Sequence, residues 1–193
     1  MQDVEIILAS ASPRRSSLLG ELGLNPTIRP ADIDETPRPG EVALDLVERL
    51  AREKVTAVEA PAAALVIAAD TIVVLDGRIL GKPLDGVEAR DYLTLLAGRS
   101  HDVATGVALR RGNEIRSAVE VTSVEMVEMS QAQIEWYVST GEYTDKAGGY
   151  AMQGIAGAFV KRISGSFDNV IGLPRNRLLH MAAEFEIDLL QHR

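Results

Sequence analysis

Two short motifs carry side chains suited to binding phosphate. Ser10-Ala11-Ser12-Pro13-Arg14-Arg15 lies between an apolar run and the start of an expected helix. Free N–H groups and the helix dipole favour an anion there, and hydroxyl and guanidinium groups add donors. An ordinary helix cap followed by two solvated arginines fits the spacing equally well. Gly81-Lys82-Pro83 could bring one more cation, although it is no Walker A loop, because proline stands where that motif has Ser or Thr.

Acidic side chains could supply a base and a metal site. Asp70 follows the apolar run Leu65–Ala69, and ligands of open α/β sheets gather at the carboxyl ends of strands. Asp70 could therefore act as a general base or a metal ligand, or it could simply mark where a strand meets solvent. Three further carboxylates could together hold a hard cation such as Mg²⁺, although acidic turns are common on surfaces. These are Asp32, Asp34 and Glu35.

A third motif is the glycine-rich segment 145–154, Asp-Lys-Ala-Gly-Gly-Tyr-Ala-Met-Gln-Gly. Glycines allow close approach of backbone, and Asp145, Lys146 and Gln153 supply charge and an amide. The alternative is a plain loop. Taken together, the motifs indicate cations that cradle a polyphosphate, carboxylates that hold a metal and one carboxylate that activates water. The pattern favours a phosphate-handling enzyme.

The elements that must position these residues alternate between strand and helix. Alternation with hairpins, such as the one predicted at Asp76-Gly77, indicates an α/β chain with a mixed sheet. We expect a single domain over residues 1–193, in two lobes around a central cleft and without a sharp boundary. Expected strands are Val4–Leu8, Thr27–Ile33, Leu65–Ala69, Thr71–Leu75, Arg78–Leu80, Val103–Leu109, Ile115–Val127 and Ala158–Ile163. Expected helices run from Ser12 to Gly23, from Glu41 to Glu59, from Val87 to Leu96, from Ser130 to Gly141 and from Pro174 to Glu184.

Composition narrows the class of protein. The chain has 193 residues, 46% hydrophobic and 25% charged, as in a globular protein. Its net charge of −8 disfavours a nucleic-acid partner, and the absence of cysteine excludes disulfides and thiolate chemistry. No apolar stretch predicts a membrane span or a signal peptide. The three histidines, His101, His180 and His192, show no metal-ligand spacing.

At these motifs the chain resembles the Maf family of nucleoside triphosphate pyrophosphatases. Five matches keep the family's order: residues 10–15, 69–73, 81–83, 141–154 and 167–174. The resemblance implies a fold like that of the inosine-triphosphate pyrophosphatases, with the site in the cleft. It also implies a hydrolase acting on an acid anhydride, which cleaves a nucleoside triphosphate with Mg²⁺ or Mn²⁺, and a cytoplasmic homodimer.

The resemblance assigns roles to individual residues. Asp70 stands at the family's catalytic proton acceptor, and Arg14, Thr71 and Gln153 stand where the family reads its substrate. Seven positions match phosphate or metal contacts, with Glu35 joining Asp70 at the metal. These are Ser12, Arg15, Glu35, Lys54, Lys82, Asp145 and Lys146.

Gln153 directs the choice of substrate within this resemblance. An amide both donates and accepts, which suits the imide edge of uracil or thymine, whereas the 7-methyl-GTP branch is expected to carry an acidic residue there. The chain therefore resembles the dTTP/UTP branch, although Ala151 stands where glycine is expected. Two alternatives remain open: a pyrophosphatase for 7-methyl-GTP or another modified nucleotide, and a nucleotide-sensing regulator of septum formation.

Overall fold

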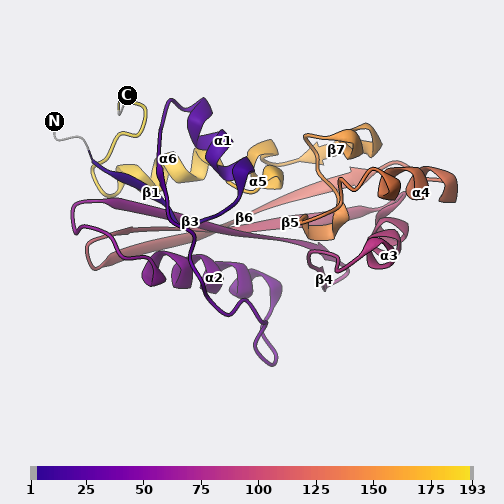
Figure 1. Ribbon diagram of the computed structural model, residues 1–193, viewed down its shortest axis with the longest axis horizontal. Helices are drawn as coiled ribbons and strands as arrows, with labels where there is room; N and C mark the ends of the chain where they lie inside the picture. Colours follow the sequence, from indigo (N-terminus) through magenta and orange to yellow (C-terminus); the bar gives the residue numbers. More distant parts are fainter. Residues whose placement is uncertain (1–3, 192–193) are drawn as a thin grey trace. The chain divides into compact units, whose positions relative to one another are not determined.

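A computed structural model describes residues 4–191, and these form a mixed sheet with helices (Figure 1). The strand order is β2-β1-β3-β5-β6-β7, with β4 beside β3. Strand β1 is parallel to β2 and β3, whereas β4 is antiparallel to β3 and β7 to β6. The strands are β1 (Ile6–Leu8), β2 (Thr27–Ile28), β3 (Leu65–Leu75), β4 (Arg78–Leu80), β5 (Ser100–Arg111), β6 (Glu114–Met126) and β7 (Val160–Ser164). The predicted α/β class with a mixed sheet is confirmed.

Helices alternate with these strands along the chain. They are α1 (Pro13–Glu21), α2 (Ala43–Ala57), α3 (Gly86–Leu96), α4 (Gln131–Ser139), α5 (Phe167–Ile171) and α6 (Arg175–Ala183). Two 3₁₀ turns, η1 (Ala147–Gly149) and η2 (Ile155–Phe159), lie in the glycine-rich part of the chain. Within residues 4–191, no helix has the length and apolar character needed to cross a membrane.

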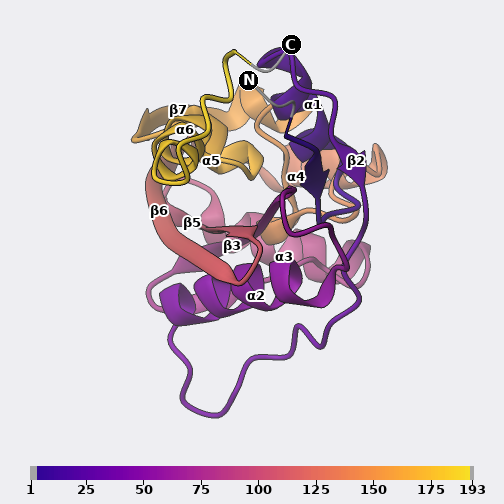
Figure 2. The same cartoon turned by 90° about the vertical axis from the view of Figure 1, so that its left-hand side faces the viewer.

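The chain divides into two compact units. The first comprises the described residues up to Asp70, Thr105–Glu120 and the chain from Gly172 on, and the second comprises Thr71–Ala104 and Val121–Ile171. In the first unit, α2 covers one face of the strands, and α1 and α6 lie on the other face (Figures 1 and 2). The second unit has its own core, in which α3 packs against α4 and η1.

Helix α2 is amphipathic, and its buried stripe explains how it packs. Buried positions recur three or four residues apart, at 46, 47, 50, 51, 54 and 55, as expected of a helix with one face on the core. Lys54 is the one charged residue of that stripe. A Cβ on Gly106 of β5 would lie 2.1 Å from the carbonyl oxygen of Val47, so glycine is needed for this close approach of helix and strand.

Several local predictions are confirmed. Asp76 and Gly77 have φ of 50° and 79°, as a two-residue type I′ turn requires, and Leu75 pairs with Arg78. Helix α4 begins with the expected capping box, in which the Ser130 and Gln133 side chains each bond the other's backbone N–H.

Three expectations about strands and helices are wrong. Strand β3 runs without a break through Asp70, because that side chain meets a buried ammonium rather than solvent, and the ladder continues to Leu75. Strand β2 stops at Ile28 instead of Ile33, and Pro30 lacks the N–H that a longer ladder would need. Helix α5 was not expected, since five residues are too short to show a helical period.

Candidate functional site

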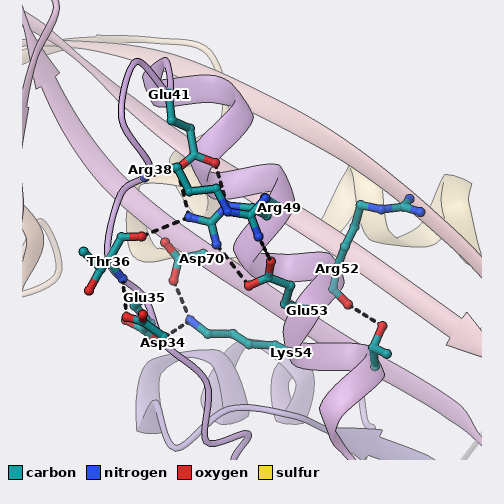
Figure 3. A network of polar contacts seen from close by, with 11 residues as sticks. Asp34, Glu35, Thr36, Arg38, Glu41, Arg49, Arg52, Glu53, Lys54 and Asp70 are labelled. Atoms are coloured by element: carbon teal, nitrogen blue, oxygen red, sulfur yellow. Dashed lines mark hydrogen bonds and ion pairs between the residues drawn. The ribbon is translucent and has the colours of Figure 1, made fainter.

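The buried pair Asp70 and Lys54 forms the centre of the site in the first unit. Asp70 lies on β3 and Lys54 lies on the buried stripe of α2, and the residues are 8% and 7% exposed. The Lys54 ammonium donates to Asp70 Oδ1 at 2.5 Å (Figure 3). A buried charge requires a partner of opposite sign, so each residue accounts for the other's presence.

Glu35 is the second carboxylate on the same ammonium. Its Oε1 lies 2.7 Å from Lys54 Nζ, and its side chain is about half exposed, at 49%. The rest of the expected acidic cluster does not join it. Asp34 accepts a hydrogen bond from the backbone N–H of Thr36 at 2.9 Å, and bonds from the Thr36 hydroxyl and amide lower the pKa of Asp34. Within residues 4–191, no three acidic, histidine or cysteine side chains gather as a metal site would require.

Arg15 brings the N-terminal motif to this centre. Its Nη1 donates to Ser10 Oγ at 3.1 Å, and its Nε donates to the carbonyl of Gly172 at 2.8 Å. Burial lowers the pKa of Arg15, while the nearby Asp70 and Glu35 carboxylates raise it. Two motifs far apart in sequence, residues 10–15 and 172–174, therefore meet at Arg15.

The remaining residues of the first motif frame the start of α1. Ser12 is the N-cap of α1 and Pro13 its first residue, as expected, but the Ser12 side chain makes no capping bond. The Ser10 hydroxyl instead accepts from the backbone N–H of Ser12 at 3.2 Å. Arg14 lies close enough to Arg15 to lower the pKa of that guanidinium. Ser10 belongs to the predicted motif, but the sequence did not show that its hydroxyl would bond the Arg15 side chain.

In the second unit, the structure brings the lysine turn and the glycine-rich segment together. Gly148 N–H donates to the Gly81 carbonyl at 2.9 Å, and a Cβ on Gly149 would lie 3.5 Å from Pro83. Lys82 is exposed at this junction. The Lys146 ammonium bonds the Thr144 carbonyl at 3.0 Å, and Asp145 has a positive φ of 61°.

Two residues expected to read the substrate also belong to this unit. Thr71 follows Asp70 on β3 and is half-buried, and Gln153 is exposed just before η2. His101, which the sequence did not single out, is buried and bonds the Tyr150 hydroxyl of the same segment at 2.7 Å. His180 is exposed, and His192 lies outside the described residues.

The donor set of the first unit suits a magnesium-like cation. Asp70 and Glu35 offer carboxylate oxygens that converge on one positive charge, that of Lys54. Mg²⁺ binds through one or two carboxylates and completes its shell with water and substrate phosphates. These two side chains therefore could hold such an ion, together with a phosphorylated ligand.

Comparison with known proteins identifies the family. The family model described as Maf-like protein matches residues 5–185. The chain belongs to the Maf family. It is 51% identical over 174 residues to a protein of Anaeromyxobacter sp. (strain Fw109-5) named dTTP/UTP pyrophosphatase, covering 88% of this chain and 83% of that one.

Other relatives carry the same name. A Symbiobacterium thermophilum protein is 48% identical over 182 residues, covering 94% of both chains, and one from Chromobacterium violaceum is 45% identical over 194 residues, covering 97% and 98%. Among solved structures, the Staphylococcus aureus Ham1 protein is similar with a TM-score of 0.52 and 15% identity, covering 95% of this chain and 100% of that one. That likeness shows the fold of this Maf protein to be Ham1-like.

Proposed function

We propose that this Maf protein is a nucleoside triphosphate pyrophosphatase that hydrolyses dTTP and UTP to the monophosphate and pyrophosphate. The observation that carries the proposal is the contact of the Lys54 ammonium with both Asp70 and Glu35, beside Arg15. Cations and convergent carboxylates are the groups that phosphoryl transfer requires. Relatives at 45–51% identity, named dTTP/UTP pyrophosphatases, support this substrate class.

In the proposed reaction, Asp70 is the proton acceptor. Lys54 contacts Oδ1, so we assign Oδ2 as the oxygen that takes a proton from water. The water oxygen then bonds phosphorus while the bridging bond between the α- and β-phosphates breaks. Pyrophosphate leaves with the electron pair if the α-phosphorus is attacked, and the monophosphate leaves with it if the β-phosphorus is attacked. Attack on the α- or the β-phosphorus gives the same products. Arg15, Lys82 and Lys146 would oppose the negative charge of the phosphates.

A divalent cation, Mg²⁺ or Mn²⁺, would be held by Asp70 and Glu35 and would neutralise charge that develops on the phosphates. Arg14, Ser12, Thr71, Asp145 and Gln153 complete the proposed set of substrate contacts. We further propose that the whole chain acts as one Maf-like domain, with the two lobes and central cleft that the resemblance implies. A homodimer in the cytoplasm, without a nucleic-acid partner, belongs to the same proposal.

Asp70→Asn tests this function. The amide keeps the size of the side chain but cannot take a proton, so kcat for dTTP should fall about 10²- to 10⁴-fold. Pyrophosphate release is measured with Mg²⁺, with Mn²⁺ and with chelator, using dTTP, UTP and 7-methyl-GTP. Near-normal kcat in the variant would remove Asp70 from the mechanism. Full activity in chelator would contradict the metal assignment, and a preference for 7-methyl-GTP would contradict the substrate assignment.

A further inference from the structure

Glu142, just beyond α4, holds the start of η2 by two backbone hydrogen bonds. Its Oε2 accepts from Ile155 N–H at 2.8 Å, and its Oε1 accepts from Ala156 N–H at 3.1 Å, 13 and 14 residues further along the chain. The residue at the N-cap of η2 is Gly154, which has no side chain to cap these groups. Bonds to a carboxylate are roughly twice as strong as bonds between neutral groups. Glu142 thus acts as a distant cap for η2.

Gly154 leaves room for the Glu142 carboxylate because it has no side chain. A Cβ at position 154 would lie 2.2 Å from Glu142 Oε2, which is closer than two such atoms can approach. The φ of Gly154 is −106°, a value that other residues adopt readily. The glycine is therefore needed for the space that the Glu142 carboxylate occupies rather than for its own backbone conformation.

The segment between Tyr150 and Ile155 is fixed at both ends. Tyr150 is buried, and its hydroxyl lies 2.7 Å from Nε2 of buried His101. Glu142 holds the other end at Ile155. Gln153 lies on the short stretch between these two anchors and is exposed. Its direction is therefore set by a backbone that is held two residues further on by Glu142 and three residues before by Tyr150.

We infer that Glu142 is a positioning residue that orients Gln153 toward the base of the substrate and so sets the preference for dTTP and UTP. This inference rests on the proposed function and on the role of Gln153 within it. Glu142 does not need to touch the substrate, because it acts through the backbone of residues 154–156. Small displacements of a positioned group can cost about 10²-fold in rate, which is enough to change selectivity.

The test compares base selectivity in three variants of the full chain. The quantity measured is the ratio of kcat/KM for dTTP to that for 7-methyl-GTP. Glu142→Ala should lower this ratio about tenfold or more, because both backbone bonds are lost. Glu142→Gln keeps one acceptor oxygen, so its ratio should lie between those of the unmodified protein and Glu142→Ala. Gly154→Ala should behave like Glu142→Ala, since the new methyl group displaces the carboxylate without removing it.

A double-mutant cycle separates positioning from general stability. In a Gln153→Ala background, Glu142→Ala should leave the ratio unchanged, because the group that it orients is gone. Glu135→Gln is the control, since Glu135 pairs with Arg90 on α3 and lies outside residues 150–156. Two results would overturn the role of Glu142. One is a folded Gly154→Ala protein whose ratio is unaltered. The other is a fall in the ratio on adding Glu142→Ala to Gln153→Ala that equals the fall caused by Glu142→Ala alone. If the unmodified protein fails to cleave dTTP, or cleaves it without selectivity, the proposed function falls as well.

Discussion

At the scale of single residues, the site depends on one ammonium shared by two carboxylates. Lys54 contacts Asp70 at 2.5 Å and Glu35 at 2.7 Å, and its side chain is only 8% exposed. Two carboxylates this close repel each other unless a positive charge lies between them. Lys54 therefore holds the two carboxylates together, at the place where we propose that a metal ion binds.

Lys54→Met tests this account of the pair. The free energy of unfolding should fall by about 3 kcal/mol, because a buried carboxylate loses its partner. Mg²⁺ should then raise the melting temperature of the variant more than that of the unmodified protein, since the ion can take the place of the ammonium. Thermal unfolding with and without Mg²⁺ measures both effects.

Lys161→Met is the matched control for Lys54→Met. Lys161 pairs with Glu125 but is 61% exposed, and exposed pairs contribute little to stability. The control should therefore lose little stability and gain nothing from Mg²⁺. Equal responses of the Lys54 and Lys161 variants to Mg²⁺ would show that the two carboxylates of the first unit do not bind the ion.

The sequence predicted the types of these residues better than their partners. Asp70 and Glu35 were named from the residue pattern and from the resemblance, and Lys54 from the resemblance alone. The structure brings both carboxylates to the Lys54 ammonium. Nothing in the spacing showed that Ser10 would bond Arg15 or that His101 would bond Tyr150, because such contacts form between segments far apart in the chain. The one local signal was Lys54 itself, because a lysine on the apolar stripe of α2 requires a buried partner of opposite charge.

At the scale of elements, α2 holds the loop that carries Glu35 by an ion-pair clasp, seen in Figure 3. Arg49 bonds Glu41 through Nε at 2.5 Å and Nη2 at 2.8 Å, and it bonds Glu53 through Nη1 at 3.0 Å. Its Nη2 also donates to the Thr36 carbonyl at 3.2 Å. This bidentate geometry ties residues 36–41 to the helix directly after Glu35.

Arg49→Ala should release this loop. We expect proteolytic cleavage within residues 34–41 to accelerate severalfold, because the bonds of Arg49 to Glu41 and to the Thr36 carbonyl are lost. Arg49→Lys keeps the charge but not the planar fork and should give an intermediate rate. Arg52→Ala is the control, since Arg52 lies on the same helix and bonds Ser117 instead. Cleavage at equal rates in Arg49→Ala and Arg52→Ala would contradict the clasp.

The bonds between Arg49 and Glu41 should persist at moderately acidic pH. The Arg49 guanidinium, helped by the backbone N–H of Arg38, lowers the pKa of Glu41 from 4.5 to about 2. A carboxyl whose pKa is lower in the folded state contributes its full stability above 4.5 and loses it as the pH falls toward 2. Protection of the loop from an acid-active protease should therefore persist at pH 4, which is a further readout in the Arg49 series.

The sequence predicted whether a segment is a helix or a strand better than it predicted the first and last residues of that segment. The period of α2 and the hairpin at Asp76-Gly77 predicted their elements because both signals are local. The expected break of β3 before Thr71 failed for a different reason. A carboxylate usually ends a buried strand, and the sequence did not reveal that Lys54 would neutralise Asp70 inside the protein.

At the scale of the whole molecule, the two units share strands. Strands β3, β5 and β6 each contribute residues to both units, so we propose that the chain unfolds as a single domain. If the chain unfolds in one step, the titration of a buried group in either unit changes the free energy of unfolding of the entire protein.

His101 is such a buried group, and its pKa predicts how the free energy of unfolding changes in acid. Burial lowers the pKa of His101 from 6.5 to about 4, because the charged imidazolium would lose its hydration. The unfolded chain therefore binds a proton near pH 6.5, whereas the folded chain does so only near pH 4. Folding is favoured by this difference above pH 6.5, and that contribution disappears as the pH falls from 6.5 toward 4.

His101→Gln should remove this dependence while leaving Tyr150 a polar neighbour. The unmodified protein should lose roughly 1.4 kcal/mol of unfolding free energy per pH unit between pH 6.5 and pH 4 through this residue, about 3 kcal/mol in all. Urea unfolding at pH 7, 6 and 5 measures the free energies of both proteins. Carboxylates that titrate in the same range are common to both, so their contributions cancel in the difference between the two proteins. The stabilities should converge as the pH falls, and parallel curves would mean that His101 is not held neutral by burial.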